Sequence, residues 1–187
     1  MKEILFKTNP QKVIEYLIQK AGKEFLSKEI QIATKMSKAG ANFALNDLVK
    51  TNLVNRQQKG NTYFYTTNDE NPVVKQLKVL RTIIDFMPLI KKLKQKTSKI
   101  ILYGSSSRGE DTEDSDIDLF IVTNLTEEVE KIMQRKKYSK KIQPIIRKPL
   151  QYIEMEKTDP IFYQEIERGI VLWEAKNESW IPKMPKK

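Results

Sequence analysis

The feature that most constrains this chain is a strand pattern with two aspartates two residues apart. The pattern SDIDLFIV begins at Ser115 and places acids at Asp116 and Asp118. Because side chains alternate between the two faces of a strand, both carboxylates point the same way, while Ile117 and Leu119 point into a core. The strand therefore predicts a sheet with a buried face and two negative charges brought together at one end.

Two carboxylates on one face of a strand repel each other unless a cation lies between them. The chain contains no His and no Cys, which excludes disulfides and zinc sites built from those residues. Oxygen ligands alone favour Mg²⁺ or Mn²⁺, and Mg²⁺ keeps part of its shell for phosphate oxygens. We therefore predict a Mg²⁺ (or Mn²⁺) site at Asp116 and Asp118, whereas a lone acid pair of this kind is more often a solvated strand end.

A Gly-Ser turn precedes this strand. The apolar run KIILY at residues 99–103 has strand length and leads into GSSSRG, which begins at Gly104. A glycine at such a junction lets the backbone approach a ligand closely, and serine amides at a helix start can hold a phosphate. Ser105 can add its hydroxyl to the phosphate oxygens, and Arg108 can pair with an anion or tie the turn to the next strand.

The turn and the acid pair together strongly resemble the minimal nucleotidyltransferase branch of the DNA polymerase β-like superfamily. The resemblance covers residues 104–122 and rests on the order and spacing of the two elements. It implies that the turn holds a triphosphate, that the aspartates are catalytic and bind the metal, and that attack on the α-phosphorus releases pyrophosphate. The nucleotide-binding residues that it implies are Gly104, Ser105, Arg108 and Ser115.

One departure from the family pattern concerns a third carboxylate, which the family carries on a later strand. After a helix predicted over residues 126–137 and capped by Thr126, the candidate strand covers residues 141–146, and Gln143 stands about where the acid should be. An amide can ligate a metal but cannot act as a general base. Glu154 and Glu156 follow in a segment with a helical pattern, so the fold would have to bring either one back. A domain that binds nucleotide without catalysing transfer is therefore an alternative interpretation.

The excess positive charge of the chain lies in its first half. Residues 1–96 contain 18 Lys and Arg against 8 Asp and Glu, whereas residues 97–187 contain 16 of each kind. A basic domain attracts polyanions, among which nucleic acid is the commonest. A lysine-rich solubilising surface explains the same numbers.

Three short helical patterns and a hairpin pattern follow one another in this half. Thr8 and Asn9 can cap the first helix, Ser27 the second and Ser37 the third, and the hairpin has its tip at residues 59–61. This order resembles a winged helix-turn-helix module over residues 5–68, which implies a third helix in the DNA major groove and a hairpin on the backbone. The DNA-binding residues so implied are Lys38, Asn42, Asn46, Arg56 and Lys59. A dimerisation or docking module is the alternative.

Residues 71–96 carry the pattern of a long connecting helix, with an apolar stripe opposite lysines. Pro88 is expected to kink or split this helix near its end. Such a helix frequently pairs with its copy, so a homodimer is a hypothesis, while packing on its own domains is the alternative. The Pro- and Lys-rich tail from Trp180 is expected to fray.

The predicted fold class is α/β (α+β). It comprises a winged helix-turn-helix domain at residues 1–70, a connecting helix at 71–97 and a mixed-sheet nucleotidyltransferase domain at 98–187. No segment is apolar enough to span a membrane and no signal peptide is evident, so a cytoplasmic location is expected.

The predicted function is Mg²⁺-dependent transfer of a nucleotide, with AMP favoured, from a nucleoside triphosphate to a protein or nucleic-acid acceptor. The main alternative is a DNA-binding transcriptional regulator whose second domain senses nucleotide without turnover. A scaffolding partner of another small protein is a third reading.

Overall fold

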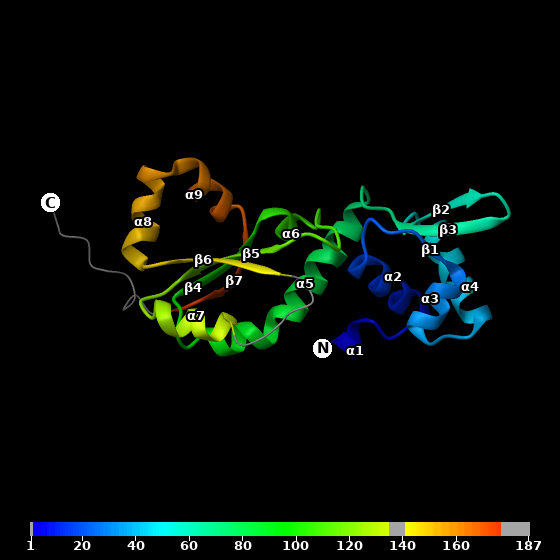
Figure 1. Ribbon diagram of the computed structural model, residues 1–187, viewed down its shortest axis with the longest axis horizontal. Coiled ribbons are helices and arrows are strands. Elements are labelled where there is room, and N and C mark those ends of the chain that lie inside the picture. Colours follow the sequence, from blue (N-terminus) through cyan, green and yellow to red (C-terminus); the bar gives the residue numbers. More distant parts are fainter. Residues whose placement is uncertain (1, 135–140, 177–187) are drawn as a thin grey trace. The chain divides into compact units, whose positions relative to one another are not determined.

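The computed structural model describes residues 2–134 and 141–176, and the chain divides into two compact units (Figure 1). The first unit is Met1–Ile84 with the loop Gly109–Asp114, and the second is Asp85–Arg108 with Ser115–Lys187. The tail from Trp180 lies outside the described residues, as do residues 135–137, which the sequence assigned to a helix. In the described part of the chain, no helix is both long and apolar enough to cross a membrane.

The first unit begins with four helices. They are α1 (Lys2–Leu5), α2 (Asn9–Gln19), α3 (Ser27–Thr34) and α4 (Lys38–Lys50). Their apolar faces form a core that includes Val13, Leu17, Ile30 and Leu45, each at most 1% exposed. Thr8 and Ser37 occupy the predicted N-cap positions of α2 and α4, and the Ser37 hydroxyl accepts from the Gly40 amide.

Ser27 was expected to cap the second helix, but it is the first helical residue of α3. Leu26 occupies the cap position instead, because its extended backbone belongs to a short strand, β1 (Phe25–Leu26). The Leu26 amide donates to the Glu29 carboxylate at 2.7 Å, so a side chain within the first turn satisfies the cap residue's donor.

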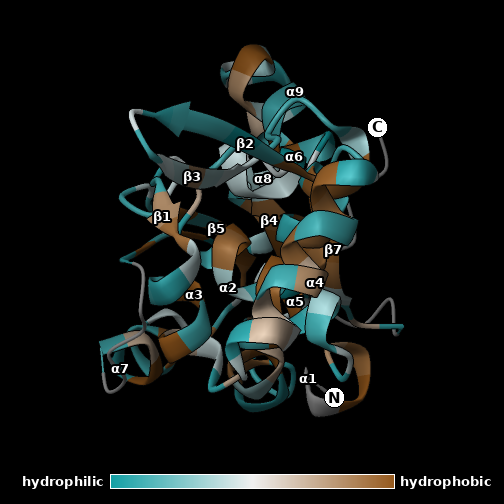
Figure 2. Cartoon of the chain, turned by 90° about the vertical axis from the view of Figure 1, so that its right-hand side faces the viewer, coloured by the Kyte–Doolittle hydropathy of each residue, from teal (hydrophilic) through white to brown (hydrophobic). Residues whose placement is uncertain are grey.

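Three antiparallel strands complete this unit, in the order β1-β3-β2. The strands β2 (Val54–Lys59) and β3 (Thr62–Thr67) form the predicted hairpin, with Gly60 at its tip in a left-handed conformation, φ +59°. Figure 2 shows β2 as hydrophilic along most of its length, and every residue of β2 after Val54 is exposed. The hairpin is confirmed, whereas the winged-helix assignment stays a prediction.

Helix α5 (Pro72–Leu93) is the predicted connecting helix. Pro88 lies inside it, and the helix continues to Leu93, so of the expected kink or split the split does not occur. A proline costs a helix about 3 kcal/mol. Burial of Phe86, Leu89 and Ile90 around it offsets that cost, since each is at most 6% exposed.

The second unit contains a four-stranded mixed sheet in the order β6-β5-β4-β7. Its strands are β4 (Lys99–Tyr103), β5 (Ile117–Val122), β6 (Ile142–Arg147) and β7 (Ile170–Glu174). Strands β5 and β6 are parallel, and the other neighbours are antiparallel. The prediction of a mixed sheet in an α/β chain is confirmed.

The helices of this unit are α6 (Gly104–Arg108), α7 (Thr126–Gln134), α8 (Pro149–Thr158) and α9 (Pro160–Glu167). Figure 1 shows α8 and α9 on the opposite side of the sheet from α7. On the side of α8 and α9, Phe120 of β5 contacts Tyr152 and Phe162. That face is the one toward which Asp118 points, because Asp118 and Phe120 are two residues apart on one strand.

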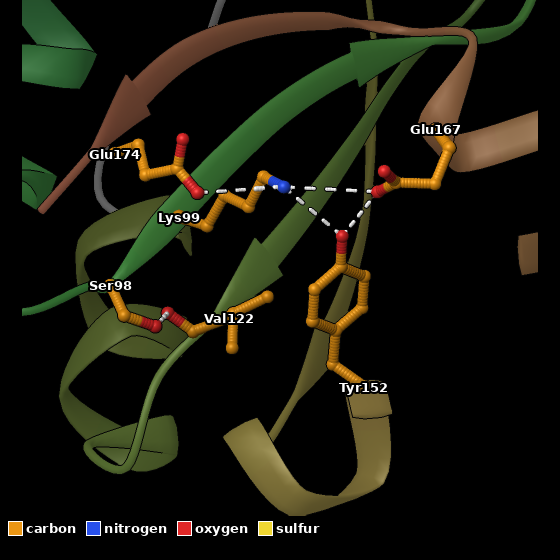
Figure 3. A network of polar contacts seen from close by, with 6 residues as sticks. All are labelled: Ser98, Lys99, Val122, Tyr152, Glu167 and Glu174. Atoms are coloured by element: carbon orange, nitrogen blue, oxygen red, sulfur yellow. Dashed lines mark hydrogen bonds and ion pairs between the residues drawn. The ribbon is translucent and has the colours of Figure 1, made fainter. Parts of the chain in front are cut away.

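A polar network ties α8, α9 and β7 to the start of β4 (Figure 3). The Lys99 ammonium donates to the Tyr152 hydroxyl at 3.1 Å and lies 3.7 Å from the Glu167 carboxylate and 3.6 Å from that of Glu174. The Tyr152 hydroxyl in turn donates to Glu167. The network therefore fixes the end of α9 against the sheet.

Candidate nucleotide and metal site

Three neighbouring strands bring three polar side chains to one end of the sheet. Tyr103 is the register partner of Asp118 across β4 and β5, and Gln143 is its partner across β5 and β6. Register partners point to the same face of a sheet. Asp118, Tyr103 and Gln143 therefore share the face that α8 and α9 cover.

Gly104 joins β4 to the turn at α6 and lies directly against Asp118. Its φ is +67°, which L side chains rarely adopt, and a Cβ built on it would overlap the Asp118 carboxylate oxygen Oδ2. Glycine is therefore required twice here, for its backbone conformation and for the close approach. The predicted phosphate-binding turn and the predicted metal-binding strand are in contact at this point.

Two serines of the turn, Ser106 and Ser107, stabilise the turn itself. The Ser107 hydroxyl donates to the Gly104 carbonyl at 2.7 Å, and Ser106 is buried. Ser105 is half-buried and Arg108 is exposed, so both lie at the surface of this end of the sheet, and Ser115 is half-buried just before Asp116.

Asp116 is held by two side chains from β6 and the residue just before it. The Gln143 side-chain amide donates to the Asp116 carboxylate, and the Lys141 ammonium lies 3.6 Å from the same oxygen. Sequence reasoning placed Gln143 near the site but missed Lys141. The parallel register of β5 and β6, which brings residues 142 and 143 beside 117 and 118, is not visible in the sequence.

The electrostatics of the site disfavour two bare carboxylates. The pKa of Asp118 is raised, first by burial and then by the negative charges of Asp116 and Glu165. Burial also raises the pKa of Tyr103 to about 12, with the charges of Asp118 and Glu165 acting in the same direction. A cation placed between the aspartates would lower the pKa of Asp118 again.

The donor set fits a divalent cation that keeps several ligands from its substrate. In residues 2–134 and 141–176, no group of three or more His, Cys, Asp or Glu side chains is arranged to hold a metal ion. Asp116 and Asp118 supply two carboxylates, and the Gln143 amide can rotate to present its oxygen. Mg²⁺ is commonly bound by one or two carboxylates plus substrate phosphates, which matches this pair.

Glu154 and Glu156 do not take the place of the third acid. Both lie exposed on α8, and the strand position beside Asp118 is occupied by Gln143. A different carboxylate, Glu165 of α9, acts electrostatically on Asp118, and sequence reasoning did not single it out. The sequence carries no signal for it, because the packing of α9 on one face of the sheet depends on the tertiary fold.

The five residues predicted to bind DNA are all exposed in the first unit. Lys38, Asn42 and Asn46 lie on α4, and Arg56 and Lys59 on β2.

Three of these five side chains have partners within the unit. Asn42 accepts from the Ser27 hydroxyl at 2.6 Å, and the Lys59 ammonium lies 2.5 Å from the Glu24 carboxylate. The Arg56 guanidinium lies over the Tyr63 ring at 4.8 Å.

Comparison with known families bears on the second unit. Residues 88–178 match the family model described as Polymerase beta, Nucleotidyltransferase. The match supports assignment of this domain to the polymerase β-like nucleotidyltransferase superfamily and, in general terms, a nucleotidyltransferase activity. A search of curated proteins gave no match.

Proposed function

We propose that this protein is a Mg²⁺-dependent nucleotidyltransferase that transfers a nucleotide, with AMP favoured, from a nucleoside triphosphate to a hydroxyl of a protein or nucleic-acid acceptor. The observation that carries the proposal is the contact between Gly104 and Asp118. It joins a turn suited to phosphates with a carboxylate suited to a cation, on a domain of the matching family.

Each residue has a role in this proposal. Asp116 and Asp118 hold the cation, which when bound neutralises charge on the phosphates and on the leaving pyrophosphate. Gly104 and Ser105 hold the phosphates through backbone amides and a hydroxyl, while Arg108 and Ser115 contact the nucleotide at the edge of the turn. The chain thereby aligns the α-phosphorus for in-line attack, and positioning and charge supply most of the rate enhancement.

The test is incubation of the purified protein with α-³²P-labelled nucleoside triphosphates and Mg²⁺, with and without host extract. A double variant, Asp116→Asn with Asp118→Asn, serves as the control. We expect label on a protein or nucleic acid with the wild type alone. Absence of transfer with all four nucleotides, together with retained Mg²⁺-dependent ATP or GTP binding, would replace the enzyme with a nucleotide sensor.

The basic first unit is proposed to direct the enzyme to nucleic acid. Lys38 and Asn46 on α4 and Arg56 on β2 are exposed together with an excess of lysine in this half of the chain. A gel shift with DNA across a salt series tests this, because each phosphate contact adds to the slope of affinity against salt. Sequence-dependent nanomolar binding would favour the regulator, whereas weak binding that vanishes with salt reflects charge alone.

A further inference from the structure

Helix α9 presents one face to the end of the sheet where the aspartates lie. Phe162 of α9 contacts the ring of Tyr103, with the ring centroids 5.8 Å apart, and Tyr103 is the register partner of Asp118. Glu165 follows Phe162 by three residues and so lies on the neighbouring part of the same helical surface. Between Phe162 and Ile166, the one charged residue is Glu165.

A cavity of about 420 Å³ lies between this helix and the turn that follows β4. Ile161, Gln164, Glu165 and Arg168 line one side of it, at the spacing i, i+3, i+4 and i+7 that places them on one helical face. Ser107 and Arg108 of α6 line the other side. Glu165 therefore faces a space that opens next to the turn assigned to the phosphates.

The chemistry of the lining indicates which part of the reaction this space serves. Five of its six residues are polar or charged, and none is aromatic. The lining offers no aromatic ring on which a nucleobase could stack, and its only planar groups are the guanidinium groups of Arg108 and Arg168 and the amide of Gln164 and carboxylate of Glu165. A hydroxyl-bearing acceptor requires polar groups to hold it and a carboxylate base to take its proton.

We propose that the cavity between α6 and α9 receives the acceptor and that Glu165 is the general base for its hydroxyl, in place of the acid missing at Gln143. This rests on the nucleotidyltransferase function proposed above. The acceptor oxygen forms a bond to the α-phosphorus as the bond from that phosphorus to the pyrophosphate oxygen breaks. The hydroxyl proton passes to the Glu165 carboxylate and then to solvent, and pyrophosphate leaves with the bonding electron pair.

The charge relationships of the site agree with this position. Glu165 contributes to raising the pKa of both Asp118 and Tyr103, after burial in each case. Glu165 itself is exposed, so its carboxylate is accessible to a bound acceptor. The Lys99 network holds Glu167, two residues further along α9, and so restricts the movement of this helix.

The experiment compares Glu165→Gln with Glu154→Gln in the full-length protein. Glu154 is an exposed glutamate of α8 and has no place in the proposed site. Label transfer from α-³²P-ATP should fall by about 10²–10⁴-fold in Glu165→Gln, the range in which general bases contribute. Transfer by Glu154→Gln should stay within about twofold of the wild type, well below that range.

A second measurement separates the base from a nucleotide-binding residue. The Mg²⁺-dependent affinity for a fluorescent ATP analogue should be the same in Glu165→Gln and in the wild type. A weakened affinity that accounts for the loss of transfer would place the nucleotide in the cavity and overturn the proposal, as would undiminished transfer by Glu165→Gln. A wild type that transfers no label would instead overturn the nucleotidyltransferase function itself.

Discussion

Gln143 is the register partner of Asp118 in the parallel pairing of β5 and β6, and its side-chain amide donates to Asp116. An amide at this position adds no negative charge to the aspartate pair and instead supplies a donor to it. With Lys141 at 3.6 Å from the same carboxylate, the site without a cation is stabilised by neighbouring donors. A third carboxylate there would have the opposite effect.

The first prediction concerns Gln143→Glu. In the absence of Mg²⁺ the variant should unfold at lower temperature than the wild type, because a third negative charge is placed beside Asp116 and Asp118. Added Mg²⁺ should stabilise the variant more than it stabilises the wild type, since three carboxylates bind the cation more tightly. Thermal unfolding with EDTA and across a Mg²⁺ series measures both effects.

Gln76→Glu is the matched control for this variant, because Gln76 is exposed on α5 and the substitution adds the same charge. Its unfolding temperature should depend on Mg²⁺ as the wild type's does. Equal Mg²⁺ responses in the two variants would show that Gln143 does not face the cation.

The sequence predicted the local parts of the site because those parts depend on short-range patterns. Alternation along SDIDLFIV was enough to put Ile117 and Leu119 in the core, where both are 1% exposed, and the two acids elsewhere. A strand followed by GSSSRG was likewise enough to predict the turn at Gly104.

The parts that the sequence did not predict depend on pairing between distant segments. Lys141 reaches Asp116 because β6 is parallel to β5, and Glu165 acts electrostatically on Asp118 because α9 covers one particular face of the sheet. The strand β1 has only two residues, too few to show an alternating pattern. The sequence also left open whether α5 would be split at Pro88, because the burial around this proline depends on the tertiary fold.

The second prediction compares Gly104→Ala with Gly60→Ala. Both glycines have positive φ, at +67° and +59°, so each alanine pays a backbone cost of about 1–2 kcal/mol. A Cβ at Gly60 meets nothing within 4 Å, whereas one at Gly104 overlaps the Asp118 carboxylate. Gly104→Ala should therefore be the less stable of the two in urea unfolding, and it alone should lose Mg²⁺-dependent ATP binding. Equal losses of stability with intact binding in both would contradict the contact.

The third prediction is a late ionisation of Tyr103. Burial first, and then Asp118 and Glu165, raise the pKa of its phenol from about 10 to about 12. Since the folded pKa is the higher one, the unfolded chain loses this proton first as the pH rises. The stabilisation is therefore complete below about pH 10 and is lost as the pH approaches 12.

Ultraviolet titration of tyrosinate in the wild type and in Tyr103→Phe isolates this group as a difference curve. The midpoint of that curve should lie well above pH 10, the ordinary value for a phenol. In an Asp118→Asn background the midpoint should move down, because one of the negative charges is removed. A difference curve centred near the ordinary value would mean that Tyr103 is not buried against the acids.

The last prediction concerns Tyr152, whose hydroxyl lies between Lys99 and Glu167 (Figure 3). Tyr152→Phe keeps the ring, which packs against Phe120 at 5.6 Å between centroids, and removes only the polar link. The free energy of unfolding should fall by about 1–2 kcal/mol, because both charged neighbours lose a hydrogen-bond partner. Tyr63→Phe removes a hydroxyl from an exposed tyrosine of β3 and should change stability by no more than about 0.5 kcal/mol.

Because the network holds the end of α9, hydrogen exchange in Pro160–Glu167 should also quicken in Tyr152→Phe. Unchanged exchange there, alongside an unchanged urea midpoint, would show that the network does not position α9, and the placement of Glu165 would then depend on the packing of Phe162 alone.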